Sequence, residues 1–365
     1  MARKIFVAAT GQNCGKTTVC LALLHLAQAK YARVGFIKPL GPKPALLNGR
    51  PMDKDAALMA EVFGLKKVLR HMSPVVLFPE TTRQVIDGQL DPSGYRGQIV
   101  AACAALEKQC DFLVIEGSGH PGVGSVVGLS NATIAGLVGA PVLLITGGGV
   151  GSVIDAVTLN RALFEKEGVE VRAVLANKLI PEKRDPTLDY LRRAFAREPF
   201  ALLGGFNYQP ILANPTLGRV ARLLGLELHG NRREAKRILH HVQIGAASTQ
   251  RVAELLKNDS LLIVTSSRDE LLVTMANLYQ IPEYRSRIVG LVIPGILPIN
   301  KITQQILDRS NIPYLRTAKN TTAELYQTIV EDVSKLTAED KEKLDLVRKL
   351  AEFRFDFEAI DRLFA

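Results

Sequence analysis

The amino-acid sequence predicts an α/β fold with a doubly wound, mainly parallel sheet, followed by a second, smaller α/β domain and a helical C-terminal tail. Three observations lead to this prediction. Short, continuous apolar runs alternate with helical patterns along the first half of the chain, which is typical of parallel strands covered on both faces. A glycine-rich loop joins the first apolar run to the first helical pattern. A polar, turn-rich segment at 230–233 interrupts the alternation, which then begins again.

The first domain is expected to span residues 1–228. Its strands are predicted from short apolar runs at 4–10, 34–39, 112–116, 142–146 and 171–177. Its helices are predicted at 16–30, 54–63, 131–138, 154–167 and 188–196. Residues 200–224 are expected to close the domain with a turn and a final short helix. This alternation of strands and helices predicts a doubly wound sheet.

The second domain is expected at 229–337, where the alternation continues on a smaller scale. Its apolar runs lie at 242–246, 261–265, 289–293 and 314–316. Its helices are predicted at 249–257, 269–279, 299–308 and 323–335. The remaining residues, 338–365, form a charged tail with a helical pattern that includes Phe353, Phe355 and Phe357. We expect this tail to dock, either on its own chain or on a partner chain.

Composition narrows the class of protein. The chain has 365 residues and a formal net charge of +10, but its basic residues are scattered apart from 231–237, so we do not expect a nucleic-acid partner. The longest mostly apolar stretch, 132–145, is interrupted by two glycines and a proline and is shorter than the roughly 20 residues of a membrane span. Four cysteines without CxxC spacing argue against a zinc site. We expect a soluble, cytoplasmic protein that forms a homo-oligomer and has no membrane partner.

The loop after the first predicted strand has the composition of a phosphate-binding P-loop. Its glycines allow backbone N–H groups to turn inward, and the following helix adds positive partial charge. Lys16 is expected to neutralise phosphate charge, and the Thr17 hydroxyl to bind Mg²⁺. The usual first glycine is displaced, because Thr10 occupies its position. The alternative is an ordinary strand-to-helix turn. The predicted nucleotide-binding residues of the loop are Gly11, Gln12, Asn13, Cys14, Gly15, Lys16, Thr17 and Thr18.

Two further features lie near the starts of predicted helices or the ends of predicted strands. Lys38 follows the second predicted strand, at the edge of the sheet where ligands of such folds bind, and the alternative is a solvated lysine. Asp53 and Asp55 open the next helix. They either interact with the helix dipole or hold Mg²⁺ opposite the P-loop, and the pattern does not separate their roles.

Glu116 ends the third predicted strand and is followed by Gly117. An acid at this position of a P-loop fold is expected to bind Mg²⁺ directly or through water, and the alternative is a tight turn. Asn177 and Lys178 end a later strand. Because asparagine offers both a donor and an acceptor, this pair is predicted to contact a purine base.

Together these residues resemble the dethiobiotin synthetase-like P-loop proteins. The resemblance covers about residues 1–225 and rests on the displaced-glycine loop, Ile37-Lys38-Pro39, the acid pair Asp53 and Asp55, Glu116-Gly117 and Asn177-Lys178. This family includes dethiobiotin synthetase, the cobyrinic acid amide synthetases and the N-terminal domain of long phosphate acetyltransferases. In the last group a DRTGG domain follows. Residues 238–335 resemble that domain, although Thr-Ser-Ser-Arg-Asp-Glu at 265–270 replaces its characteristic Gly-Asp-Arg turn.

The resemblance implies ATP and Mg²⁺ as cofactors and favours the metal-binding role of the acid pair. It implies either a nucleotide-responsive regulatory protein or ATPase, or an ATP-dependent ligase that activates a small carboxylic acid or carbamate. In the ligase, Lys16 and Lys38 would be the catalytic residues, stabilising the transferred phosphoryl group. The acetyltransferase domain that follows in the long phosphate acetyltransferases is not expected in this chain.

Overall fold

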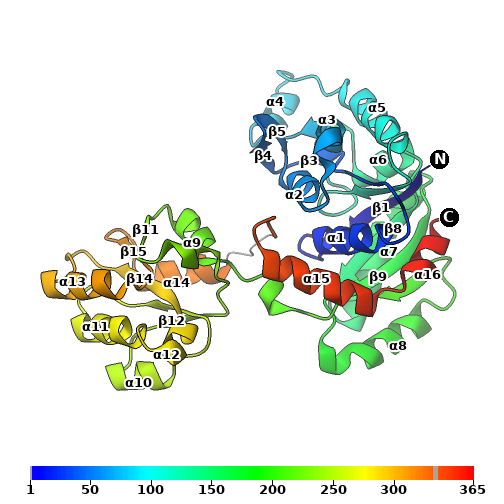
Figure 1. The fold of residues 1–365 in the computed structure, drawn as a ribbon. Coiled ribbons are helices and arrows are strands. Elements are labelled where there is room, and N and C mark those ends of the chain that lie inside the picture. The colour runs from blue at the N-terminus through cyan, green and yellow to red at the C-terminus, as the bar shows by residue number, and fades with distance from the viewer. Residues whose placement is uncertain (1, 332–335) are drawn as a thin grey trace. The chain divides into compact units, whose positions relative to one another are not determined.

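The computed structural model describes residues 2–331 and 336–365. The chain divides into two compact units, Met1–Tyr208 with Lys341–Ala365, and Gln209–Asp340 (Figure 1). The first unit ends earlier than the boundary expected at residue 228. The physical reason is that the helix at 217–224 buries Leu217 and Val220 in the core of the second unit, beside Val289.

The first unit is built on one parallel sheet, which confirms the predicted fold class. Its strands follow the order β10-β9-β8-β1-β7-β2, and every neighbouring pair is parallel. β7 is buried along its whole length and β8 along all but its last residue, as their continuous apolar sequences predict. The strands are β1 (Arg3–Ala9), β2 (Val34–Ile37), β7 (Phe112–Glu116), β8 (Val142–Gly147), β9 (Val171–Asn177) and β10 (Ala201–Gly204).

Helices cover both faces of this sheet. Phe6 and Ala8 of β1 lie in one hydrophobic cluster with residues of α5 to α8. The alternate residues Ile5 and Val7 are equally buried and point to the other face, which α1 covers. The helices are α1 (Lys16–Ala27), α5 (Tyr95–Glu107), α6 (Asn131–Leu137), α7 (Val150–Lys166) and α8 (Arg184–Ala194).

Between β2 and α5 the chain forms short elements that the apolar pattern did not predict, apart from α2. β4 and β5 form an antiparallel hairpin, and β3 pairs with β6 in parallel. This region carries Asp53 and Asp55 to the edge of the main sheet. Its elements are β3 (Leu40–Gly41), β4 (Pro44–Leu47), β5 (Arg50–Asp53), α2 (Lys54–Val62), α3 (Leu69–Met72), β6 (Val75–Val76) and α4 (Thr81–Ile86).

The tail forms two helices that belong to the first unit. In Figure 1, α15 (Lys341–Arg354) and α16 (Phe357–Leu363) lie beside α1, and both contact it. Phe355 and Phe357 are buried, whereas Phe353 is 76% exposed. The tail therefore docks on its own chain.

The second unit has its own five-stranded sheet, in the order β11-β15-β14-β13-β12, with only β11 antiparallel to its neighbour. α10, α11 and α13 cover one face, and α9 and α14 the other. The predicted helix at 323–335 is observed as α14, and 332–335 lie outside the described residues. The strands are β11 (Leu228–His229), β12 (His241–Ile244), β13 (Ser260–Ile263), β14 (Ile288–Pro294) and β15 (Tyr314–Thr317). The helices are α9 (Leu217–Leu224), α10 (Thr249–Glu254), α11 (Asp269–Leu278), α12 (Pro282–Arg287), α13 (Lys301–Ser310) and α14 (Thr322–Glu331).

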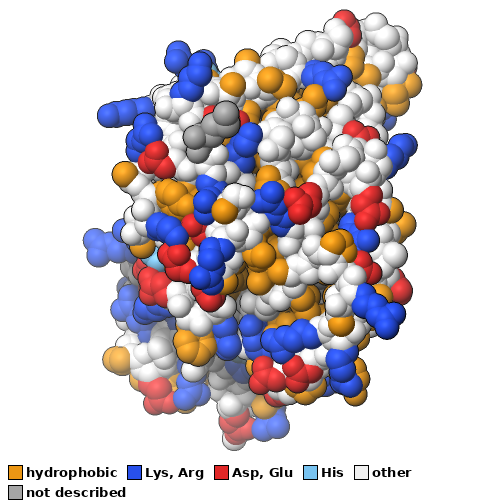
Figure 2. Space-filling view, turned by 90° about the vertical axis from the view of Figure 1, so that its right-hand side faces the viewer, with side chains coloured by type: hydrophobic (Ala, Val, Ile, Leu, Met, Phe, Trp, Pro, Cys, Tyr) orange, Lys and Arg blue, Asp and Glu red, His pale blue; other side chains and the backbone are white. Residues whose placement is uncertain are grey.

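The surface carries charges of both signs. On the face drawn in Figure 2, Lys and Arg side chains lie among Asp and Glu side chains and do not gather into one basic stripe. Within the described residues, every helix is too short or too polar to cross a membrane.

Candidate functional site

The loop between β1 and α1 has the backbone geometry of an anion-binding loop. Its first residue, Thr10, donates its N–H to the Ile145 carbonyl of β8 at 2.9 Å, which fixes the start of the loop against the sheet. Asn13 and Gly15 have positive φ angles of 57° and 98°. Alternation of left- and right-handed residues is what turns successive N–H groups toward one point. A side chain at Gly15 would lie 2.4 Å from the Asn177 amide nitrogen, so this position requires glycine.

Lys16 and Thr17 begin α1 and face the loop that follows β7. The Lys16 ammonium donates to the Gly119 carbonyl at 2.8 Å and to the Gly11 carbonyl at 3.3 Å. Burial lowers the pKa of Lys16. The Thr17 hydroxyl donates to Glu116 Oε1 at 3.0 Å. Of the other predicted loop residues, Gln12 and Asn13 are exposed, and those partly buried are Gly11, Cys14, Gly15 and Thr18.

Lys38 lies at the centre of a buried ion cluster. The strands β2 and β7 are in register at Ile37 and Ile115, so Lys38 and Glu116 leave the sheet side by side. The Lys38 ammonium is 3.0 Å from Glu116 Oε1 and 3.1 Å from Asp55 Oδ2, and it donates to the Gly117 carbonyl at 3.0 Å. The solvated-lysine alternative is therefore wrong, because Lys38 is only 3% exposed.

Charge pairing decides the protonation of this cluster. Burial alone would lower the pKa of Lys38, but the Glu116 and Asp55 carboxylates outweigh it and raise the pKa above its ordinary value. Burial raises the pKa of Glu116, although Lys38 opposes the rise. Lys38 thus keeps its charge, and the cluster holds two acids against one base.

The acid pair has two distinct positions, which the sequence could not separate. Asp53 caps α2, because its Oδ1 accepts the Asp55 N–H at 2.8 Å while its Oδ2 accepts the Lys43 N–H at 3.1 Å. Asp55 instead turns its carboxylate to Lys38. Burial, and then the charge of Asp55, raise the pKa of Asp53. Of the two, Asp55 is the residue that belongs to the ion cluster around Glu116.

The oxygen atoms around Glu116 fit a Mg²⁺ ion. Glu116 Oε2 is buried and has no hydrogen-bond partner in the structure as described, although a buried carboxylate oxygen normally has one. The Thr17 hydroxyl lies beside the same carboxylate. No group of three or more His, Cys, Asp or Glu residues suited to a metal occurs among residues 2–331 and 336–365. Mg²⁺ does not require one, since it usually takes one or two protein ligands and completes its shell with phosphates and water.

Asn177 and Lys178 occupy different environments. Asn177 is buried, and its Nδ2 donates to the Cys14 carbonyl at 2.8 Å while its Oδ1 accepts the Phe206 N–H at 2.9 Å. Lys178 is exposed, with a φ of 55°. The structure thus uses the Asn177 amide to hold the P-loop, and contact of this pair with a purine stays a prediction.

Asn131 is a site residue that sequence reasoning missed. Its Oδ1 accepts the Ser118 N–H at 2.9 Å, and its Nδ2 donates to the Ser118 and His120 carbonyls. It therefore fixes the loop whose Gly119 carbonyl receives Lys16. Asn131 follows the helix-capping Ser130, and this capping pattern was the only signal available in the sequence.

The fold and this site define a P-loop nucleotide-binding protein. A family model described as the AAA domain matches residues 3–216, and a DRTGG domain model matches residues 220–329. The chain belongs to this AAA-domain family, in its dethiobiotin synthetase-like form, and carries a DRTGG domain after it.

Curated relatives agree with this assignment. The chain is 24% identical to phosphate acetyltransferase of Synechocystis over 80% of this chain and 42% of that protein. It is 27% identical to the ATP-dependent dethiobiotin synthetase of Aromatoleum aromaticum over 52% of this chain and 85% of that protein. It is 30% identical to cobyric acid synthase of Pelotomaculum thermopropionicum over 57% of this chain and 43% of that protein. The chain thus spans less than half the length of the first and third relatives.

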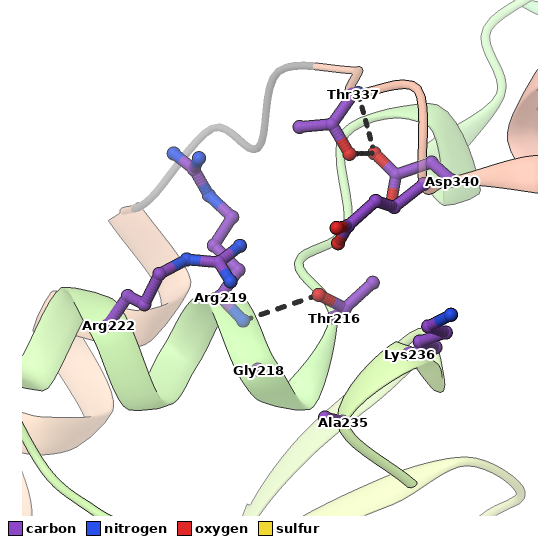
Figure 3. Close-up of a pocket in the computed structure, with 9 residues that line it drawn as sticks. Thr216, Gly218, Arg219, Arg222, Ala235, Lys236, Thr337 and Asp340 are labelled. Carbon is purple, nitrogen blue, oxygen red and sulfur yellow. Dashed lines mark hydrogen bonds between the residues drawn. The ribbon is translucent and has the colours of Figure 1, made fainter. Parts of the chain in front are cut away.

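A small hollow also occurs within the second unit. Figure 3 shows Arg219 and Arg222 from α9 on one side and Thr337 and Asp340 on the other, with the Thr337 hydroxyl hydrogen-bonded to Asp340 at 3.0 Å. Lys236 and Glu339 also line it. Because its lining contains charges of both signs, it favours no one class of ligand.

Proposed function

We propose that this chain is a Mg-ATP-binding, nucleotide-responsive regulatory protein or ATPase, related to the N-terminal region of phosphate acetyltransferase. The observation that carries the proposal is the convergence of Lys16 and Thr17, from the loop after β1, with Glu116 at the end of β7. A nucleoside triphosphate and its metal are bound by such groups: a lysine, a hydroxyl and a buried acid at the carboxyl edge of a parallel sheet.

Each residue has a role that follows from its surroundings. Lys16, now bonded to two loop carbonyls, would exchange them for the more strongly attracting phosphate oxygens. Thr17 and Glu116 would hold Mg²⁺, with Asp55 near them. The metal would neutralise phosphate charge and polarise the bond to the terminal phosphoryl group. Lys38 holds Glu116 and Asp55 together in a buried place.

A regulatory role is supported by the carboxyl edge of the second sheet. Arg268 donates to the Gly245 and Ala247 carbonyls, and Arg316 donates to the Ile293 and Leu297 carbonyls. These arginines brace the loops at the edge where such a sheet would bind a ligand. The second unit therefore has the character of a partner-facing or sensing domain. A homo-oligomer in the cytoplasm is part of this proposal.

An ATP-dependent ligase is the second candidate. It is favoured by the extent of the match to dethiobiotin synthetase, which covers 85% of that enzyme. In this role a small carboxylate or carbamate would attack the terminal phosphoryl group, with Lys16 and Lys38 stabilising the charge that develops.

A turnover assay separates the two roles. Phosphate release from Mg-ATP is measured alone and with a panel of small mono- and dicarboxylic acids. The proposal predicts phosphate release that none of the acids stimulates. A purely regulatory protein should stay below about one turnover per hour, whereas typical enzymes turn over near 10 times per second. Strong stimulation by one acid would overturn the regulatory role and establish the ligase.

A further inference from the structure

The C-terminal tail is fastened to the first unit beside β1 and α1. Asp361 of α16 is 2% exposed. Its carboxylate forms ion pairs with Arg3 at 2.7 Å and Lys30 at 2.9 Å, and it accepts a hydrogen bond from the Tyr31 hydroxyl at 2.8 Å. These three partners lie at the start of β1 and just after α1, the two elements that the P-loop joins. The tail is thus attached to both elements that the P-loop joins, at their ends away from the loop.

A second attachment leads from the tail toward the loop itself. The Phe355 ring packs edge-on against the Phe206 ring, with 4.8 Å between their centres, and both residues are buried. The backbone of Phe206 is held on both sides, since its N–H donates to Asn177 Oδ1 and its carbonyl accepts the Leu179 N–H at 3.1 Å. A shift of Phe355 therefore acts on the residue that positions Asn177.

Asn177 has no room to adjust independently. A Cβ at Gly15 would lie 2.4 Å from its Nδ2, and a Cβ at Gly205 would lie 2.7 Å from its Oδ1. The amide is therefore wedged between the P-loop backbone and the backbone beside Phe206. Because its Nδ2 also holds the Cys14 carbonyl, the position of Phe206 is transmitted to the P-loop.

We propose that Phe355 is a positioning residue of the nucleotide site: through Phe206 and Asn177 it holds the backbone of Cys14 and Gly15 in its phosphate-binding conformation. The chain enters the second unit shortly after Phe206 and leaves it at Lys341, where α15 begins. The contact between Phe206 and Phe355 thus joins a segment of the first unit just before the second unit to a segment that follows α15. The inference rests on the proposed binding of ATP at this loop.

The test compares Phe355→Ala with Phe353→Ala in the full chain. Phe353 lies two residues before Phe355, in the last turn of α15, but is exposed, so it is a matched control. The first readout is the rate at which a thiol reagent labels Cys14, which is partly exposed while the other three cysteines are buried. The second is the Kd of Mg-ATP. Because Phe355→Ala removes a buried aromatic pair, it should raise both the labelling rate and the Kd about two- to tenfold. Phe353→Ala should leave both quantities unchanged.

Each outcome has a separate meaning. Unchanged Cys14 labelling in Phe355→Ala would overturn the positioning role, whether or not ATP binds. Absence of ATP binding in the unsubstituted chain would overturn the proposed function, while the labelling rates still decide the inference. If Phe355→Ala does not fold, Phe355→Leu replaces it. It keeps an apolar side chain but loses the edge-on ring contact, and it must then show faster labelling than Phe353→Ala.

Discussion

At the scale of single residues, the site depends on a buried arrangement of two acids and one base. Glu116 and Asp55 are both buried and share Lys38 as their cation. Such a cluster is a weak source of stability, because removing charges from water costs nearly as much as their attraction returns. In the proposed function, the unpartnered Glu116 Oε2 is the oxygen available to a metal.

Lys38→Ala should destabilise the chain, more strongly in alkaline than in acidic solution. Removing one partner of a buried pair typically costs about 3–5 kcal/mol. Burial raises the pKa of Glu116, and without Lys38 only the more weakly acting Lys16 still opposes this rise. An acid whose pKa is raised in the folded state binds its proton more tightly when the chain is folded. The free energy of unfolding that Lys38→Ala removes therefore becomes smaller as the pH falls and Glu116 is neutralised.

Urea unfolding at pH 5.5 and pH 8 measures this difference. Lys67→Ala, at an exposed lysine, is the control and should change the free energy of unfolding little at either pH. Equal destabilisation by Lys38→Ala at both pH values would contradict this account, because it would show that Glu116 and Asp55 do not repel each other when Lys38 is absent.

Single residues also mark the limit of sequence reasoning. The P-loop and Glu116 could be predicted, because each is set by a local pattern of strand, glycine and helix. The roles of Asn131 and Asn177 could not, since their bonds depend on which loops meet at the edge of the sheet. The same holds for Asp53 and Asp55, which one turn directs to different partners.

At the scale of elements, prediction succeeded where strands are buried on both faces. The observed β7 and β9 have the predicted bounds, because each is a mainly apolar run that ends in a polar residue. The short strands β3 to β6 have no such run. β4 and β5 pair as a local hairpin, whereas the pairing of β3 depends on the distant β6. α9 was assigned to the wrong neighbour, since an amphipathic helix does not reveal which of two sheets it covers.

The tail should detach more easily when Asp361 loses its charge. Asp361→Asn leaves Arg3 and Lys30 without their buried anion, which should cost about 1–3 kcal/mol at pH 7. Burial alone would raise the pKa of Asp361, but hydrogen bonds from Lys30, Tyr31 and Arg3 outweigh it and lower the pKa. This contribution is complete above the unfolded pKa of about 3.9 and is lost as the pH falls through the folded value.

Glu358→Gln is the matched control for this prediction. Glu358 pairs with the same Lys30 but is exposed, so its loss should cost well under 1 kcal/mol. Unfolding free energies at pH 7 and pH 3 are compared. A cost of Asp361→Asn that persists undiminished at pH 3, or a cost no larger than that of Glu358→Gln, would contradict the attachment.

At the scale of the whole molecule, one chain carries two α/β units, and the first is completed by both ends of the sequence. Along the sequence, the chain passes through the second unit and then returns to the first. A sequence read in order predicts consecutive domains, so the tail's place on α1 could be expected only as docking of some kind. This division agrees with the relatives. The match to dethiobiotin synthetase covers 52% of this chain, whereas the match to phosphate acetyltransferase covers 80% of it.

The central claim is that the loop around Lys16 binds Mg-ATP, and titration calorimetry of the full chain tests it most directly. The unsubstituted chain should bind one Mg-ATP, and at a ligand concentration of a hundred times Kd it should gain about 2.7 kcal/mol of stability. Lys16→Ala should abolish both effects, while Lys67→Ala should bind normally. Binding that is unchanged in Lys16→Ala, or absent from the unsubstituted chain, would contradict the assignment of this loop.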